Sequence, residues 1–417
     1  MEIKREKYLK ELQDREWNGQ VKVITGCRRS GKSYLLFKIF KEYLVEKGVA
    51  PDVIIELALD QIDNEALREP HALYGHLIDI IKDKRKRYYI MLDEIQYVDR
   101  FDEVLNSLAR IENVDVYVTG SNSKLLSKDV LTSFRGRGDE IRLHPLSFAE
   151  YMENYDGESR KAWQEYLLYG GLPRTLALSS DDQKAKYLKD LFEETYLKDI
   201  IERYNLRTDD ELGDLVNILA SSVGSLTNPS KLERTFRSNG KDITDKTIRA
   251  YIGYLEDSFL INGAQRYDVK GKKYIDTPIK YYFEDLGLRN ARLNFRQSEY
   301  NHLMENAIYN ELIYRGYAVD VGVIETSVKD KDGARKRAAL EIDFVANKGS
   351  KRYYLQSAFS MPEMKKLQQE ERPLMMVKDE FKKLIISGDN IVPAYNDNGV
   401  MMMNVIDFLL EPGSLDL

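Results

Sequence analysis

A glycine-rich segment near the start of the chain has the residue types and spacing that bind phosphate. Residues 26–33 follow the pattern Gly-x-x-x-x-Gly-Lys-Ser, after an apolar run at residues 21–25 and before a helix-like run at residues 34–40. The glycines let backbone N–H groups face a phosphate at the positive end of a helix dipole. In this pattern the lysine reaches the β- and γ-phosphates, and the serine hydroxyl binds Mg²⁺. The segment therefore predicts a site for a nucleoside triphosphate, made by Gly26, Cys27, Arg28, Arg29, Ser30, Gly31, Lys32, Ser33 and Tyr34.

Two carboxylates follow a second apolar run. Residues 88–92 precede Asp93 and Glu94, which is typical of a buried parallel strand whose polar groups emerge at its carboxyl end. Asp93 is expected to hold Mg²⁺ through water. Glu94 is expected to polarise the attacking water as a general base. With Lys32, this pair predicts hydrolysis of the bound triphosphate.

A third strand-like run, residues 114–119, ends in Gly120-Ser121-Asn122-Ser123. A polar side chain at this position can lie between the γ-phosphate and the attacking water. Asn122 is the candidate, with Ser121 as the other possibility; an ordinary turn is the alternative interpretation.

The elements that must position these groups alternate along the chain. Strand-like runs at residues 21–25, 53–57, 88–92 and 114–119, with an edge strand at 139–143, are separated by helix-like runs. This alternation predicts an α/β fold with a parallel sheet. Residues 53–57 are expected to form a buried strand.

The motifs together resemble the prokaryotic archaeal-type P-loop ATPases of the wider AAA/STAND-like group. The resemblance rests on residues 26–33, 92–94 and 119–123, and on Gly136-Arg137 followed by residues 145–148, and it covers essentially the whole chain. It implies ATP as the nucleotide, with Mg²⁺. It also implies an extra strand between the phosphate-loop strand and the Asp-Glu strand.

Two further site residues are suggested by the same resemblance. Arg135 or Arg137 would neutralise charge on the transferred phosphate, and Arg137 is the catalytic candidate, acting on a neighbour's site in an ATP-dependent homo-oligomer. A solvent-exposed basic turn is the alternative. Pro173, in Tyr169-Gly170-Gly171-Leu172-Pro173, would pack a lid near the adenine; a proline at a helix start explains it as well.

Composition narrows the class of protein. The chain of 417 residues is 43% hydrophobic and 32% charged, with a net charge of −6, one cysteine and four histidines. It has no apolar run near the roughly 18 residues of a membrane span, and its charged start is unlike a signal peptide. These features predict a cytoplasmic protein without a membrane partner, an internal disulfide or a Cys/His metal site.

The middle of the chain predicts a winged helix-turn-helix. Helical patterns from residue 211 to 257 precede a hairpin at 259–285. Residues 231–249 hold six basic and three acidic side chains, and residues 266–280 hold five and two. This basic stretch, 231–280, is a candidate contact for double-stranded DNA; a packing or relay module is the alternative. The candidate contacts are Lys246, Arg249, Lys270, Lys272 and Lys273.

The end of the chain resembles a PD-(D/E)xK nuclease core that has lost its chemistry. Glu305 lies on a predicted helix and Asp343 on a predicted strand, but Gln356 and Ala358 stand where a carboxylate and a lysine are required. Such a nuclease needs two carboxylates for Mg²⁺ and a lysine beside the attacking water. Glu341 and Glu305 could partly replace the lost ligand, but the sequence offers no replacement for the lysine, so we expect no cleavage.

The combined prediction is an α/β P-loop ATPase of AAA-like fold with three appended parts. The ATPase core is expected at 1–150, and the appended parts are a helical lid at 151–205, a winged helix-turn-helix at 206–290 and an inactive nuclease-like domain at 291–417. The expected function is an ATP-driven switch or motor acting on DNA. The alternatives are a STAND-like sensor that assembles with protein partners, and an ATP-gated nuclease.

Overall fold

The computed structural model describes residues 3–120, 138–206, 210–296, 299–329 and 335–417. The chain forms two compact units, which are described separately. The first contains residues 1–145 and 257–259, and the second contains residues 146–256 and 260–417.

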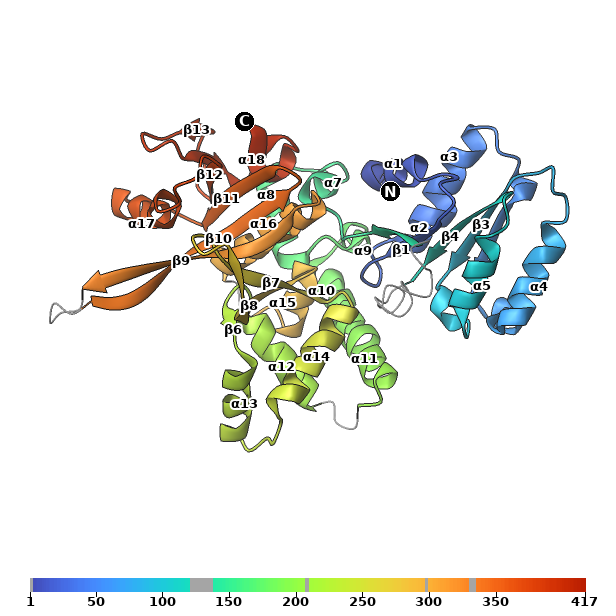
Figure 1. The fold of residues 1–417 in the computed structure, drawn as a ribbon, viewed down its shortest axis with the longest axis horizontal. Helices are drawn as coiled ribbons and strands as arrows, with labels where there is room; N and C mark the ends of the chain where they lie inside the picture. Colours follow the sequence, from blue (N-terminus) through green and yellow to red (C-terminus); the bar gives the residue numbers. More distant parts are fainter. Residues whose placement is uncertain (1–2, 121–137, 207–209, 297–298, 330–334) are drawn as a thin grey trace. The chain divides into compact units, whose positions relative to one another are not determined.

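The first unit contains a parallel sheet of five strands, ordered β2-β3-β4-β1-β5 (Figure 1). The strands are β1 (Val21–Thr25), β2 (Ile54–Ala58), β3 (Tyr88–Asp93), β4 (Val114–Thr119) and β5 (Gly138–Arg142). Strand β4 lies between β1 and β3, so the predicted extra strand is confirmed, as is the parallel α/β fold. The interpretation of residues 53–57 as a fully buried strand is corrected. Strand β2 is an edge strand, and burial alternates along it because only one face packs on helices.

Helices cover both faces of this sheet. They are α1 (Glu6–Asp14), the continuous helical run of α2 (Lys32–Tyr34), η1 (Leu35–Phe40) and α3 (Lys41–Glu46), then α4 (Pro70–Ile80) and α5 (Phe101–Leu108), with short turns η2 (Pro51–Val53), η3 (Ile62–Arg68) and η4 (Ile95–Tyr97). One face packs Ile90 and Val116 against the apolar side chains of α4 and α5. On the other face, Tyr117 contacts Phe40 of η1. Thr25 and Asp93 are polar residues at the carboxyl ends of β1 and β3, where these strands meet the loops that follow.

The second unit begins with helices. They are α7 (Phe148–Met152), α8 (Ser159–Tyr169), α9 (Pro173–Leu176) and the run of α10 (Asp181–Asp190), η6 (Leu191–Leu197) and α11 (Lys198–Arg203). The turn between α8 and α9 fits closely against α15 (Leu286–Arg292): Asp285, the N-cap of α15, accepts a hydrogen bond from the Gly171 N–H at 2.7 Å. A Cβ on Gly170, whose φ is +72°, would come within 2.3 Å of the Asp285 carboxylate. The glycines therefore serve this packing contact.

The next elements follow the order of the predicted winged helix. They are α12 (Asp210–Ser221), β6 (Leu226–Thr227), α13 (Pro229–Ser238), α14 (Asp245–Asp257), β7 (Ile261–Asp268) and β8 (Lys273–Phe283). Strands β7 and β8 form the predicted hairpin, and β6 pairs antiparallel with β8. Strand β7 also pairs in parallel with β9 (Ala318–Lys329). The hairpin thus belongs to the same sheet as the C-terminal strands.

The C-terminal part completes a sheet of nine strands, ordered β13-β14-β12-β11-β10-β9-β7-β8-β6 (Figure 1). Its remaining elements are α16 (Tyr300–Tyr314), β10 (Arg335–Lys348), β11 (Lys351–Ala358), α17 (Met364–Met375), β12 (Lys382–Ser387), β13 (Ala394–Tyr395), β14 (Met401–Asn404), α18 (Val405–Leu410) and η7 (Ser414–Asp416). Strands β11, β12 and β14 are parallel, and β9, β10 and β11 pair antiparallel.

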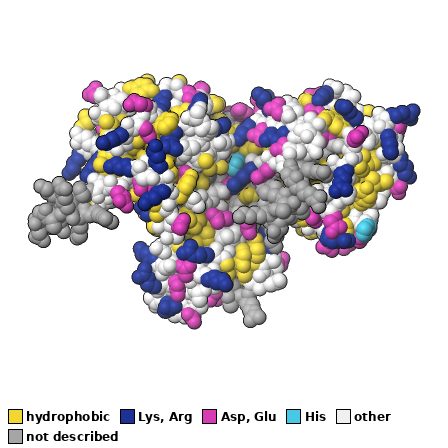
Figure 2. Space-filling model, viewed as in Figure 1, with side chains coloured by type: hydrophobic (Ala, Val, Ile, Leu, Met, Phe, Trp, Pro, Cys, Tyr) yellow, Lys and Arg dark blue, Asp and Glu magenta, His cyan; other side chains and the backbone are white. Residues whose placement is uncertain are grey.

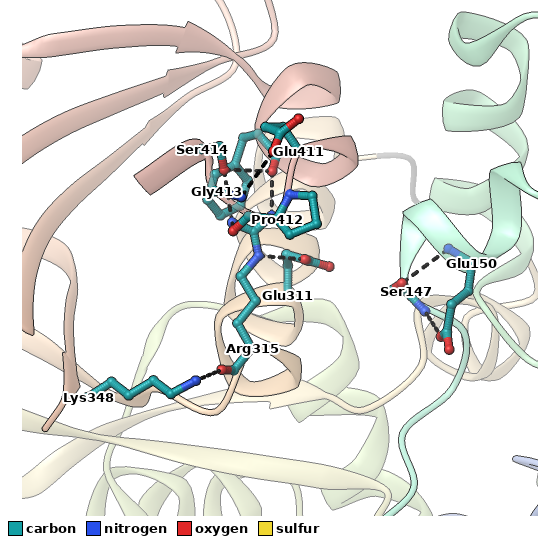
Figure 3. Close-up of polar contacts among 10 residues, drawn as sticks. Ser147, Glu150, Glu311, Arg315, Lys348, Glu411, Pro412, Gly413 and Ser414 are labelled. Carbon is teal, nitrogen blue, oxygen red and sulfur yellow. Dashed lines mark hydrogen bonds and ion pairs between the residues drawn. The ribbon is translucent and has the colours of Figure 1, made fainter. Parts of the chain in front are cut away.

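Arg315 fastens the end of the chain to α16 (Figure 3). Its guanidinium donates to Glu311 Oε1 at 2.7 Å, to Ser414 Oγ at 2.8 Å and to the Phe408 carbonyl oxygen. Lys348 Nζ donates to the Arg315 carbonyl oxygen at 2.7 Å. Since the Arg315 and Glu311 side chains are both more than nine-tenths buried, this pair is well shielded from solvent. Strand β10 and the terminal helices are thereby held to one helix end.

Candidate functional site

The glycine-rich segment forms a tight loop between β1 and α2, as its pattern predicts. Gly26 has φ +138°, and a Cβ built there would lie 2.1 Å from the Leu143 carbonyl oxygen. Gly31 has φ +101° and is the N-cap of α2. The loop can therefore adopt this path only with glycine at residue 26, because a side chain would collide with the backbone that follows β5.

Lys32 and Ser30 lie inside this loop. The Lys32 ammonium is buried and donates to the carbonyl oxygens of Gly26 and Cys27, each at 3.0 Å. Burial lowers the pKa of Lys32, and the nearby Glu94 opposes that shift. The Ser30 hydroxyl is buried and has no hydrogen-bond partner within the described ranges. A buried ammonium and an unsatisfied hydroxyl in a glycine-rich loop at the start of a helix fit a bound phosphate.

Asp93 and the loop serine Ser33 lie close enough to interact. Asp93 ends β3 and is buried, and burial raises the pKa of its carboxyl group, while hydrogen bonds from the Thr119 and Ser33 hydroxyls oppose the shift. Strand β4 separates β1 from β3 in the sheet. Ser33, at the start of the helix that follows the loop, nevertheless lies near Asp93 at the end of β3. A hydroxyl and a carboxylate in this arrangement are hard oxygen ligands suited to Mg²⁺. The two residues predicted to hold Mg²⁺ are therefore neighbours.

Glu94 is held by its backbone and by a neighbouring amide. It has φ +52°, and it is the N-cap of η4. Its carboxylate accepts a hydrogen bond from Gln96 Nε2. A non-glycine residue in the left-handed region is strained, and such strain persists where the surroundings fix it. Strand β3 therefore ends at Asp93, and the chain turns at Glu94 into η4.

Thr119 is the residue of this site that the sequence analysis did not single out. At the end of β4, its hydroxyl donates to Asp93 Oδ1 and accepts from the Glu94 N–H at 3.1 Å. The signal was present, since Thr119 directly precedes the polar segment that follows β4. It connects both carboxylate residues to the central strand.

Thr119→Val is expected to lower the rate of ATP hydrolysis by roughly tenfold or more, with a smaller effect on ATP affinity. Valine keeps the shape but leaves the Asp93 oxygen and the Glu94 N–H without this partner. Steady-state hydrolysis and an ATP-binding titration would measure the two effects. Thr175→Val is the matched control, because that buried hydroxyl bonds only the Leu172 carbonyl oxygen in the second unit. Equal rates in both variants would contradict the positioning role of Thr119.

The remaining predicted site residues differ in burial, and some of them lie outside the described residues. Arg28 is half-buried, Arg29 and Tyr34 are exposed, and Cys27 is buried within the loop. Asn122, Arg137 and their alternatives Ser121 and Arg135 lie outside the described residues, so their roles stay predictions. Pro173 is the first residue of α9 in the second unit, as its alternative interpretation stated. Its proposed contact with adenine also stays a prediction.

The predicted DNA contacts include exposed cations on the helices and at the hairpin turn. Lys and Arg side chains are spread over the visible surface of the protein (Figure 2). The exposed ones are Lys231, Arg234, Arg237, Lys246, Arg249, Lys270, Lys272 and Lys273. Acidic neighbours offset some of this charge: Arg249 pairs with Asp245, and Arg237 pairs with Glu233. The three lysines of the turn have no ion pair recorded among the described residues. The turn therefore carries three cations, and the Asp268 carboxylate within it accepts hydrogen bonds from the Lys270 and Gly271 N–H groups.

Lys280 was counted in the basic stretch, but its position differs from that of a surface cation. It is buried, and its ammonium lies 2.9 Å from Glu305 Oε1, 2.8 Å from Glu341 Oε1 and 3.8 Å from Asp343 Oδ1. Burial would lower the pKa of Lys280, but these carboxylates raise it far above its usual range. The structure thus brings together the predicted carboxylates of α16 and β10. It also places among them a lysine that the sequence analysis had counted in the basic stretch.

Gln356 and Ala358 lie on β11, as predicted. Gln356 Oε1 accepts from the Asp343 N–H at 3.2 Å, and its amide nitrogen donates to Glu370 Oε2 at 3.4 Å. The Ala358 side chain is buried in the apolar core of this sheet. Among the described residues, no group of three or more His, Cys, Asp or Glu side chains has an arrangement suited to a metal ion. Nor does any helix in those ranges have the length and apolar character needed to cross a bilayer.

Comparison with protein families agrees with the first unit's geometry. Residues 18–152 match the family model described as an AAA domain. Residues 160–299 match a model described as a domain of unknown function, and this match runs without a break from α8 through the hairpin and α15.

Two relatives match nearly the whole chain. An uncharacterised protein of Haemophilus influenzae is 34% identical over 414 residues, which are 98% of this chain and 99% of the relative. An uncharacterised protein of Methanocaldococcus jannaschii is 27% identical over 405 residues, which are 93% of this chain and 85% of that protein.

Solved structures resemble the chain only in part. The Aeropyrum pernix ORC1 protein in complex with DNA is 14% identical, with 70% of this chain and 92% of that chain covered and a TM-score of 0.30. A DNA polymerase III gamma subunit-related protein of Thermotoga maritima is 10% identical, with 60% and 99% covered and a TM-score of 0.28. TM-scores this low do not support a functional argument.

Proposed function

The chain belongs to the same family as the Haemophilus influenzae relative, and on this premise we propose that it binds ATP with Mg²⁺ and hydrolyses the ATP. The AAA domain at residues 18–152 supports the proposal. The observation that carries it is the contact between the two halves of the site. Ser33 at the phosphate-binding loop lies close enough to Asp93 at the end of β3 to oppose the rise in its pKa, and Lys32 and Glu94 lie near enough to interact electrostatically.

Each residue has a distinct role in this proposal. The loop N–H groups and Lys32 bind the phosphates, and Ser33 with Asp93 would hold Mg²⁺, which would neutralise phosphate charge. Glu94 orients the attacking water and accepts its proton. Thr119 keeps Asp93 and Glu94 in place. ADP and phosphate are the products.

We also propose that hydrolysis is used on double-stranded DNA. The exposed lysines and arginines of α13, α14 and the β7–β8 turn support a contact with phosphate groups that does not depend on base sequence. The assignments of residues 151–205 as a lid and of residues 291–417 as a nuclease-like domain without cleavage belong to the same proposal. So does an ATP-dependent homo-oligomer in which Arg137 acts between subunits.

The rate of ATP hydrolysis with and without duplex DNA tests this function. We expect duplex to stimulate turnover. The triple variant Lys270→Glu/Lys272→Glu/Lys273→Glu should weaken duplex binding by roughly tenfold or more and flatten its dependence on salt, because three cations facing phosphates are reversed. Fluorescence anisotropy at several salt concentrations measures both effects.

A second triple variant provides the charge-matched control. Lys82→Glu/Lys84→Glu/Lys86→Glu makes the same change of net charge at exposed positions of the first unit. Duplex affinity that is equally reduced in both variants would assign the effect to net charge and remove the hairpin turn from the interface. Two results together would instead favour a sensor with protein partners. They are a rate of ATP hydrolysis that duplex DNA does not change, and nucleotide-dependent assembly seen by light scattering.

A further inference from the structure

Three aromatic rings and one arginine form a continuous row across the nine-stranded sheet. The ring centroids of Tyr274 on β8 and Tyr267 on β7 lie 5.5 Å apart. The Arg352 guanidinium of β11 lies 5.6 Å from the Tyr267 ring centroid and 5.4 Å from that of Phe381, which directly precedes β12. Each step along the row is therefore a contact between two rings or between a cation and a ring. We call these four side chains the aromatic strip.

The aromatic strip lies on a face of the sheet that α17 covers only in part. Tyr267 packs at the margin of the core cluster that Tyr354 of β11 forms with α17. Arg352 is two residues before Tyr354 on the same strand and so faces the same side. The two ends of the strip are open to solvent, since Tyr274 is 59% exposed and Phe381 is 40% exposed. Large exposed rings that continue from one strand to the next are typical of a binding surface.

Lysines lie on the same face as the strip and at its hairpin end. Lys272 and Lys273 are exposed and directly precede Tyr274. On β12, Lys383 pairs in register with Tyr354 and therefore faces the same side of the sheet as the strip. The guanidinium within the strip adds a further cation, so rings and positive charges alternate along this face.

Carboxylates near the strip offset part of this charge. Asp320 Oδ2 accepts a hydrogen bond from the Tyr274 hydroxyl at 3.3 Å, and Asp379 Oδ2 accepts one from the Tyr354 hydroxyl at 2.7 Å. Glu380, which precedes Phe381 in the chain, is exposed. The positive charge is therefore greatest at the hairpin end of the strip, where two lysines are adjacent to the most exposed ring.

Exposed rings interleaved with cations match the chemistry of an unpaired nucleic-acid strand. Unpaired bases stack on aromatic side chains and their phosphates contact lysine and arginine, largely without regard to base sequence. Bases in a duplex are already stacked on one another, so they cannot use such rings. We infer that the aromatic strip binds single-stranded DNA, with bases stacked on Tyr274 and Phe381 and phosphates near Lys272, Lys273 and Arg352. This inference rests on the proposed function for its choice of DNA, and it adds a single-strand site beside the proposed duplex contact.

Fluorescence anisotropy of labelled oligo(dT), titrated with the full-length, nucleotide-free protein, provides the test. We expect the natural chain to bind oligo(dT). Tyr274→Ala/Phe381→Ala should weaken that binding by roughly 100-fold, because each lost stacking ring contributes about tenfold. Tyr274→Phe keeps the ring but removes the hydroxyl that bonds Asp320, so it should bind oligo(dT) as the natural chain does.

Two controls make this result specific. Tyr395→Ala removes a ring that is also highly exposed and lies on β13 of the same sheet, and it should leave oligo(dT) affinity unchanged. Duplex affinity should be unchanged in Tyr274→Ala/Phe381→Ala, whereas the triple lysine variant of the hairpin turn should weaken the binding of both DNA forms. Failure of duplex binding alone would thus contradict the proposed duplex contact and leave the single-strand site standing.

An introduced indole reports stacking directly. Tyr274→Trp places a fluorescent ring at the exposed end of the strip, and oligo(dT) should quench its emission, measured against the natural chain with its two tryptophans. Three results would overturn the inference. They are natural oligo(dT) affinity in Tyr274→Ala/Phe381→Ala, an equal loss of duplex and oligo(dT) affinity in that variant, and an oligo(dT) complex in which the emission of Tyr274→Trp is unchanged.

Discussion

Glu94→Gln is expected to lower the rate of ATP hydrolysis by roughly 10²- to 10⁴-fold while ATP stays bound. Glutamine keeps the size of the side chain and its place at the start of η4, but it cannot accept the proton of the attacking water. Nucleotide binding depends on the loop and Lys32, which this change leaves intact. The kinetic signature is therefore a fall in kcat with a nearly constant dissociation constant for ATP.

Two comparisons make this result specific. Glu103→Gln changes an exposed carboxylate on α5 in the same unit and should hydrolyse ATP at the natural rate. Lys32→Ala should behave in the opposite way from Glu94→Gln, because it removes the cation from the loop and so weakens binding itself. Single-turnover hydrolysis and equilibrium binding of a fluorescent ATP analogue separate the two defects. Natural turnover in Glu94→Gln would mean that another group is the base.

Gly26→Ala is expected to abolish ATP binding and to destabilise the first unit by roughly 3 kcal/mol or more. The added Cβ would lie 2.1 Å from the Leu143 carbonyl oxygen, at a φ of +138° that side chains rarely adopt. Strain of the backbone dihedral and steric overlap each cost about 1–3 kcal/mol. The loop must move to relieve them, and its N–H groups then no longer face the phosphates. Denaturant unfolding and ATP titration measure the two effects.

Substitutions at two other glycines distinguish the effect of backbone strain from the effect of a steric clash. Gly31, in the loop, has φ +101°, and Gly19, before β1, has φ +76°; a Cβ at either position meets nothing within 4 Å. Gly31→Ala should therefore disturb ATP binding with a smaller loss of stability than Gly26→Ala. Gly19→Ala should cost some stability and leave ATP binding unchanged. If Gly26→Ala bound ATP as tightly as Gly19→Ala, the close approach to Leu143 would not be what shapes the loop.

Most of the nucleotide site could be predicted because its parts are local in sequence. The loop at residues 26–33 needs only a strand before it and a helix after it, and both are encoded by adjacent residues. The carboxylates of Asp93 and Glu94 follow from the end of a single apolar run. The family resemblance implied an extra strand between the phosphate-loop strand and the Asp-Glu strand, and the position of β4 between β1 and β3 confirms it.

Predictions that depended on distant neighbours were less complete. The pair of glycines at residues 170–171 was explained as a turn or a lid contact, whereas the structure shows it packed on the buried carboxylate of Asp285. The hairpin at β7 and β8 was predicted with its turn, but its parallel pairing with β9 was not. The sequence of a segment indicates that it forms a strand. Which strands it pairs with is decided by the tertiary fold.

The sequence by itself determined the glycine-rich loop between β1 and α2, the Asp-Glu end of β3 and the α/β class, because contiguous residues and their periodicity encode them. Only the tertiary structure decided that Thr119 joins Asp93 to Glu94 and that Lys280 lies among the carboxylates of α16 and β10. Such contacts depend on strand order and pairing register, which no local pattern carries. A lysine that reads as a surface cation of a basic hairpin thus becomes a buried counter-ion, because the sheet places β8 beside acidic side chains far along the chain.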